Sequence, residues 1–235
     1  MDTLVEMEMD MVVNNNGEEQ HAESVTSMDV SCIYEPLELK MDMTVEVSGE
    51  TAATSLYIEN TEDGCVAYVN TGDGWQSQRI SETDADQYNY STDMAIYLYG
   101  DYDFQENGME EINGANAYKY TGTIAGEEMK QLMLSSGALD SVSQLNIDTS
   151  QIESMLDELE PLSVDLWIDE ATLYPVRYEI DMTASMDLLM SSIVEAMGEQ
   201  GEGMSMSVPK MVTRMTCSNF NGVTEITVPE EVKAN

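Results

Sequence analysis

The chain has 235 residues, 42% of them hydrophobic, and a formal net charge of -38 from 46 acidic residues against 8 basic ones. A charge of this sign and size repels nucleic-acid phosphates and anionic lipid headgroups, which excludes nucleic-acid binding and disfavours peripheral docking on a membrane. The hydrophobic content is that of a folded protein, long enough to bury about 70% of its unfolded surface, and we predict a single domain over residues 1–235.

The first third of the sequence predicts a meander of antiparallel strands. Residues 4–13 alternate between apolar and acidic side chains, which places one set on a buried face and the other toward solvent. Turn residues then recur, beginning with Asn14-Asn15-Asn16-Gly17, so consecutive strands are expected to pair as hairpins. Further strands of this meander are predicted at residues 23–34, 37–47, 56–59, 66–69 and 76–80.

Helices are predicted where the spacing of apolar residues changes. Residues 82–99 have a mixed spacing that favours a helix, and the pair Asn113-Gly114 then marks a hairpin between strands at 110–112 and 117–120. Apolar stripes at helical spacing indicate three more helices, at residues 123–137, 149–159 and 185–197.

The most regular stretch runs from Leu162 to Met182 and predicts two strands joined by a turn. Trp167 falls on the outward face of this hairpin and Tyr174 precedes a proline, so we expect other parts of the chain to pack on both. A last strand is predicted at 210–219, and residues 223–229 are expected to close the domain. This order of elements predicts an α+β fold with one large antiparallel sheet.

Methionine is the most unusual part of the composition, with 20 in the chain. Several stand at alternate positions, which places their thioethers on one face of a strand: Met7-x-Met9-x-Met11, Met41-x-Met43 and Met204-x-Met206. Three uses are open: ordinary core filling, a soft wall that adapts to a flexible apolar ligand, and a thioether site for Cu(I). The single histidine of the chain argues against the copper site, which we do not predict.

Catalytic and metal motifs are weak in this sequence. His21 lies in an acidic turn, so catalysis of the Ser-His-Asp or Cys-His type would have to use a solvated side chain. The segment from Asp101 begins like a calcium loop but has Glu106 where the loop needs glycine and Ile112 where it needs glutamate. We therefore predict no enzyme, no catalytic residue, no cofactor and no metal site.

Cys32, Cys65 and Cys217 show no CxxC spacing and fall inside predicted strands. We interpret them as small buried apolar residues, and a single disulfide with one remaining thiol stays open as an alternative. The sequence contains no run of about 18 apolar residues that could span a membrane.

Three stretches resemble the LolA-like and LppX-like extracytoplasmic lipoprotein carriers, most of all uncharacterised Gram-positive lipoproteins of this type. They are the tyrosine strand ending in Gly-Asp-Gly-Trp (65–75), the Asn-Gly hairpin with TGTIAGEEMKQLM (113–133) and LWIDEATLYPVRYEIDM (166–182). The resemblance implies a sheet curved into a half-barrel, helices packed on its concave face, and an apolar cavity between them that holds lipid or acyl chains.

From this resemblance we predict a non-enzymatic binding protein for a lipid or other apolar ligand, extracytoplasmic and either membrane-anchored or at the cell surface. The resemblance also implies a signal peptide and an N-terminal lipid anchor. Because the first strand begins within a few residues of Met1, we expect that both have been removed from this sequence. The alternative is a structural or sensory module of the cell envelope, with a filled core and a protein partner. The predicted cavity wall consists of Met7, Met9, Met41, Met43, Met129, Leu132, Leu166 and Ile180.

Overall fold

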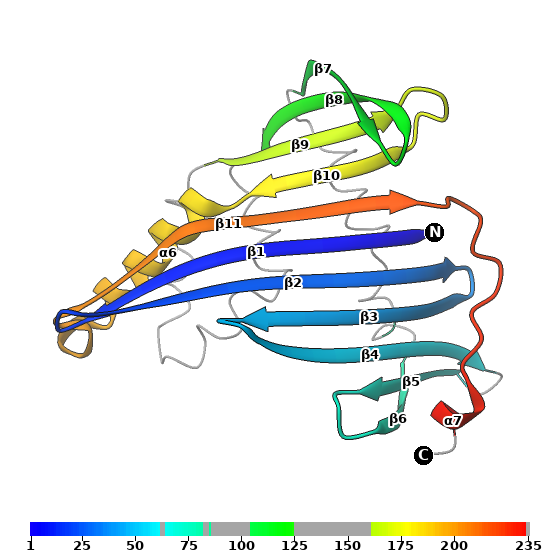
Figure 1. The fold of residues 1–235 in the computed structure, drawn as a ribbon, viewed down its shortest axis with the longest axis horizontal. Helices are drawn as coiled ribbons and strands as arrows, with labels where there is room; N and C mark the ends of the chain where they lie inside the picture. The colour runs from blue at the N-terminus through cyan, green and yellow to red at the C-terminus, as the bar shows by residue number, and fades with distance from the viewer. Residues whose placement is uncertain (62–63, 82–84, 86–103, 125–160, 234–235) are drawn as a thin grey trace.

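The computed structural model describes residues 1–61, 64–81, 85, 104–124 and 161–233, whose strands form one open, curved sheet (Figure 1). The sheet has 11 strands, all paired antiparallel, in the order β6-β5-β4-β3-β2-β1-β11-β10-β9-β8-β7. The strands are β1 (Asp2–Asn15), β2 (Glu18–Tyr34), β3 (Leu37–Val47), β4 (Glu50–Thr61), β5 (Gly64–Asn70), β6 (Trp75–Ile80), β7 (Gln105–Ile112), β8 (Ala115–Ile124), β9 (Leu162–Asp169), β10 (Pro175–Asp181) and β11 (Met204–Ser218).

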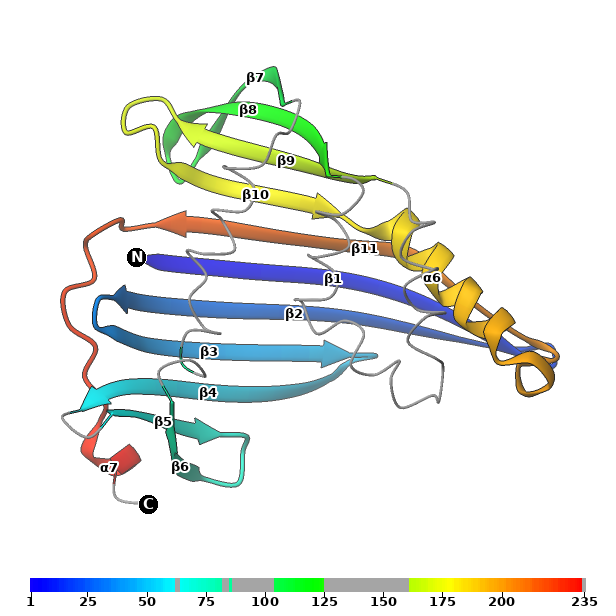
Figure 2. The ribbon, with the colours of Figure 1, turned by 180° about the vertical axis from the view of Figure 1, so that it is seen from behind.

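Two meanders make up this sheet, β1–β6 and β7–β11, and within each the neighbours in sequence are neighbours in space. The first and last strands, β1 and β11, pair with each other and join the two meanders. A helix, α6 (Thr183–Ala196), packs on the concave face near this junction, as Figure 2 shows from behind. The predicted fold class, α+β with one large curved antiparallel sheet, is confirmed.

The predicted helices have different outcomes. The helix expected at 185–197 is α6, followed by a short 3-10 turn, η1 (Gly198–Gly201). The helix predicted from Thr123 is wrong at its start: Thr123 and Ile124 pair with Ser163 and Leu162 on β9, and Ile124 is buried. The rest of that helix, with Met129 and Leu132, lies outside the described residues, as do the predicted helices at 149–159 and, apart from Ala85, 82–99.

The pairing register divides the sheet into two faces of opposite character. Side chains that stand directly opposite each other in neighbouring strands point to the same side. The row through Val5 is apolar across six strands: Leu166, Tyr178, Met215, Val5, Met28 and Met43. We call this side the apolar face and the other side the polar face.

The polar face holds the charged residues of the central strands. Arg214 donates from Nε to Glu179 Oε2 at 2.7 Å, and its Nη1 lies 3.7 Å from Glu6 Oε2. Lys119 Nζ lies 2.8 Å from Asp165 Oδ2. By register, the described strands place their Lys and Arg residues on this face: Lys40, Arg79, Lys119, Arg177, Lys210 and Arg214. The basic side chains of the described strands are therefore kept away from the apolar face.

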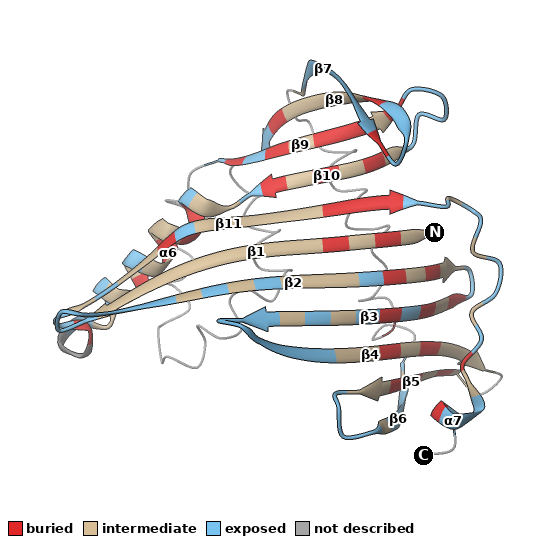
Figure 3. Ribbon diagram, in the orientation of Figure 1, coloured by how far each residue is buried: buried red, intermediate tan, exposed pale blue. Residues whose placement is uncertain are grey.

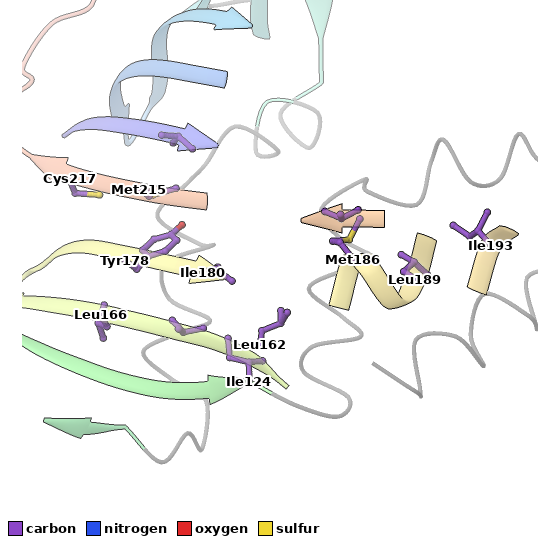
Figure 4. Packing of buried hydrophobic residues seen from close by; sticks show 13 residues of the cluster. Ile124, Leu162, Leu166, Tyr178, Ile180, Met186, Leu189, Ile193, Met215 and Cys217 are labelled. Carbon is purple, nitrogen blue, oxygen red and sulfur yellow. The ribbon is translucent and has the colours of Figure 1, made fainter. Parts of the chain in front are cut away.

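Two clusters of buried residues lie on the apolar face. One joins β1 and β8–β11 to α6 through side chains such as Leu166, Ile180 and Leu189, which Figure 4 shows close up. The other lies on β2–β5 and centres on Leu39 and Ile58, both 0% exposed. In Figure 3 the buried segments of β1–β4 gather at one end of the sheet, while the opposite end of these strands is half-buried or exposed.

The segment after β11 runs along one end of the sheet and ends in α7 (Glu230–Lys233), a short helix that the sequence did not predict (Figures 1 and 2). Val228 and Val232 are buried against Tyr68 on the polar side of β5. Lys233 Nζ donates to Glu59 Oε1 at 2.6 Å. This C-terminal segment therefore connects the end of β11 to β4 and β5 of the β1–β6 meander.

The turn between β9 and β10 is closed by one carboxylate. Asp169 Oδ1 accepts hydrogen bonds from the Thr172 hydroxyl and backbone N–H, both at 2.7 Å, and from the Ala171 N–H at 3.1 Å. These bonds, with that of the Thr172 hydroxyl the strongest, lower the pKa of Asp169 because they favour its charged form. The folded turn therefore favours the ionised form of Asp169 over the protonated one.

We expect Asp169→Ala to lower the melting temperature at neutral pH and to lose this effect in acid. Because the folded pKa lies below the ordinary value of 3.8, the carboxylate stabilises the fold above that pH and ceases to as the pH falls through the folded pKa. Thermal unfolding of both proteins from pH 7 to about pH 2 measures the difference. Glu111→Ala, at an exposed site, is the control. A difference that stays constant across this range would contradict the account.

Candidate ligand-binding face

The half-buried end of the apolar face is lined by methionines from four neighbouring strands. They are intermediate in burial, in contrast to the clusters beside them. We call this set the methionine face: Met7, Met9 and Met11 on β1, Met28 on β2, Met43 on β3 and Met211 on β11. It lies toward the β1–β2 turn, where Figure 3 shows the strands no longer buried.

The strand register brings these side chains close to one another. Met9 stands directly opposite Met211, and Met28 directly opposite Met43, so the Cβ atoms of each pair are about 5 Å apart. Met7 lies between these two rows, at about 7 Å along the strand from Met9. The set spans four strands, a width of about 14 Å, and about 20 Å along β1. The set thus forms an apolar strip that is longer along the strands than it is wide across them.

Neutral side chains fill the positions between the methionines. Thr26 and Thr213 flank Met7, and Ser24 flanks Met9. Between the row of Val5 and the row of Met11, no Asp, Glu, Lys or Arg of the described strands faces this strip, with the exception of Glu50 at the margin of β4. In a chain with 46 acidic residues, such a strip needs the strict alternation of β1, which turns Glu6, Glu8 and Asp10 to the polar face.

The methionine face lies at the margin of the packed core. Met28 and Met211 pack against the cluster that contains α6. Among the described residues, the four clusters of buried side chains do not include Met7, Met9, Met11 or Met43. The thioethers on β1 and β3 are thus apolar, half-buried and uncharged, without being part of a described core cluster.

The predicted wall residues divide between two environments. Met41, Leu166 and Ile180 are buried in the two clusters, whereas Met7, Met9 and Met43 belong to the methionine face. All of these share the apolar face, and Met129 and Leu132 lie outside the described residues. Met11, Met28 and Met211 were not predicted as wall residues. Alternation could have added Met11, but Met211 joins the set through the β1–β11 pairing, for which the sequence carries no local signal.

A depression of about 470 Å³ lies where α6 begins, next to one residue of the methionine face, since the Met211 N–H donates to the Thr183 hydroxyl at 2.9 Å. Its two carboxylates already accept backbone hydrogen bonds: Asp181 Oδ1 from the Thr183 N–H at 2.9 Å and Asp187 Oδ1 from the Val208 N–H at 2.8 Å. These contacts fix α6 to β10 and β11. The residues around the depression are Pro161, Ser163, Asp181, Thr183, Ala184, Asp187, Ser207, Val208 and Pro209, with none of the predicted wall residues among them.

The three cysteines are buried thiols, as predicted. Burial raises the pKa of Cys32 and of Cys217 to about 11, so both thiols stay protonated at neutral pH. His21 is exposed, and its Nε2 lies 2.7 Å from Glu19 Oε1. In the part of the chain that the structure describes, no three His, Cys, Asp or Glu side chains are grouped so that they could hold a metal ion.

None of the described helices has the length and apolar character needed to cross a membrane.

The comparisons with known proteins give a family and several similar structures. The family model described as "Family of unknown function (DUF6612)" matches residues 2–235. No curated protein matches the chain. The lipoprotein LppX from Mycobacterium tuberculosis is similar at 17% identity, over 94% of this chain and 89% of that one, with a TM-score of 0.42.

Two further solved structures are similar over most of their length. LprF from Mycobacterium bovis is 16% identical, over 97% of this chain and 90% of that one, with a TM-score of 0.41. A putative outer membrane lipoprotein-sorting protein domain from Vibrio parahaemolyticus is 12% identical, over 92% and 83%, with a TM-score of 0.22. The matches thus include the LppX and lipoprotein-sorting groups that the sequence resembles.

Proposed function

This chain belongs to the family of unknown function DUF6612, and from that premise we propose that it is an extracytoplasmic, lipoprotein-type binding protein whose methionine face receives an apolar chain such as a lipid acyl group. We further propose that it is held at the membrane or cell surface by an N-terminal lipid anchor. The proposal agrees with the resemblance of the sequence to LolA-like and LppX-like lipoprotein carriers.

The observation that carries the proposal is the separation of charge and apolar surface on one sheet. The same strand, β1, sends Glu6 and Glu8 to one side and Met7 and Met9 to the other. Contiguous apolar surface that remains accessible usually marks a binding site. Each methylene of a ligand buried there would contribute about 0.8 kcal/mol, and thioethers adapt their rotamers to chains of different shape.

The chemistry of the described residues supports binding rather than catalysis. Burial raises the pKa of the thiols of Cys32 and Cys217, which disfavours their nucleophilic thiolate form, and His21 is exposed beside Glu19. The methionine face offers a ligand apolar contact and no group that transfers a proton. These properties support the proposed role as a binding protein.

Native mass spectrometry of gently purified protein, followed by solvent extraction, tests the proposal. We expect a discrete adduct whose mass extracts as a lipid, or uptake of a dansyl-labelled fatty acid by the bare protein. A bare mass without uptake of that probe would reject the binding role. It would support instead an envelope module with a filled core and a protein partner.

A further inference from the structure

The methionines of the apolar face differ in how far a small oxidant can reach them. Met7, Met9, Met11 and Met43 are half-buried. On the same face, Met41 is 8% exposed and Met215 4% exposed, each within a core cluster. The sheet thus carries an accessible set and a protected set of thioethers, side by side on neighbouring positions.

Hydrogen peroxide oxidises a thioether by transferring one oxygen atom to sulfur. The sulfur loses two electrons and becomes a sulfoxide, the O–O bond of the peroxide breaks, and water is released; no bond of the protein is broken. The product is polar and chiral where the thioether was apolar and flexible, and methionine sulfoxide reductases reverse the change. Accessibility of the sulfur decides which methionines react first.

Sulfoxides on the methionine face would stand where the strip is free of charge. Met9 faces Met211 directly, and Met7 is flanked by Thr26 and Thr213. A hydroxyl can donate to a sulfoxide oxygen in the empty protein, but an acyl chain laid over the strip offers no donor. The oxidised face would therefore be stable when open to water and penalised when covered by an apolar ligand.

We propose that the methionine face is a reversible oxidation site, at which peroxide converts Met7, Met9, Met11 and Met43 to sulfoxides before the buried methionines and thereby releases the apolar ligand. This inference rests on the proposed function, since it supplies a regulation of the same face. The oxidant is a peroxide and the restoring activity is a methionine sulfoxide reductase.

The test is graded oxidation of the full chain with hydrogen peroxide, removal of the peroxide, and peptide mass spectrometry alongside titration with a dansyl-labelled fatty acid. We expect sulfoxide at Met7, Met9, Met11 and Met43 before the buried references Met41 and Met215, and earliest at Met109, which is 46% exposed on β7. The dissociation constant of the probe should rise about tenfold or more while circular dichroism shows the sheet retained. Reductase treatment should restore binding.

Two variants separate the local effect from general damage. In the triple variant Met7→Leu/Met9→Leu/Met11→Leu, the ratio of the dissociation constants of the probe after and before peroxide treatment should fall close to one, because leucine keeps the apolar volume without sulfur. Met41→Leu, at a buried position of the same face, should keep full sensitivity.

Three results would overturn the inference, and they are distinguishable. Sulfoxide spread evenly over exposed and buried methionines would refute the selectivity. Unchanged probe binding after selective oxidation would refute the release while leaving the proposed function intact. Absence of probe binding before oxidation would reject the proposed function, and with it the proposed release of the ligand on oxidation.

Discussion

Replacing Trp167 by alanine is expected to lower the free energy of unfolding by about 3–5 kcal/mol. Trp167 lies on the polar face of β9 but is only 4% exposed, packed with Ile112, Ala117 and Val176. Its indole N–H donates to Glu110 Oε2 at 3.0 Å, and Lys119 Nζ lies 4.7 Å from the ring centroid. Alanine would leave a cavity and remove a hydrogen bond and a cation–π contact together.

Denaturant unfolding followed by circular dichroism measures this loss. The matched control is Trp75→Ala, which removes the other of the two tryptophans. Trp75 is half-buried against Tyr57, with ring centroids 5.6 Å apart, so a smaller loss of about 1–2 kcal/mol is expected. Equal losses in the two variants would contradict the assignment of Trp167 to a packed cluster.

The substitution Met9→Asp is expected to raise the dissociation constant of a fatty-acid probe by about a hundredfold or more. The new carboxylate would face Met211 across the strands, on a strip whose described neighbours are uncharged. A ligand lying on the strip would have to desolvate this charge without a cation to pair with it. The measurement is probe titration by fluorescence.

The control for this prediction places the same charge on the same strand. Val12→Asp turns its carboxylate to the polar face, since Val12 stands opposite His21 on β2 and its parity is that of Glu6 and Glu8. We expect unchanged binding for Val12→Asp and near-normal binding for Met9→Leu. Equal loss in Met9→Asp and Val12→Asp would indicate general destabilisation and count against the methionine face.

Strands and hairpins could be predicted because alternation is a local property. The strand expected at 37–47 has those bounds as β3, and the hairpin from Leu162 to Met182 is β9–β10. β2 begins at Glu18 and β4 at Glu50, earlier than predicted. Their added residues are mostly polar, and backbone pairing extends through them without an apolar signal.

Contacts between distant parts of the chain could not be predicted. The β1–β11 pairing, which sets Met9 beside Met211, joins opposite ends of the sequence and depends on the whole sheet. The expectation that other parts of the chain pack on Trp167 and Tyr174 is confirmed, but several partners come from segments far away in sequence, among them Ile112 beside Trp167 and Phe220, whose ring centroid lies 4.8 Å from that of Tyr174. α7 has four residues, too few for an apolar stripe to be recognised.

Photo-crosslinking with a diazirine-labelled fatty acid, followed by peptide mass spectrometry, tests most directly whether an apolar chain lies on the methionine face. The account predicts adducts on the apolar-face residues of β1, β2, β3 and β11, around Met7, Met9, Met43 and Met211. Adducts concentrated on the polar face, for example around Tyr68 and Trp75 beside α7, would contradict it. So would uniform low labelling that an excess of unlabelled fatty acid does not compete.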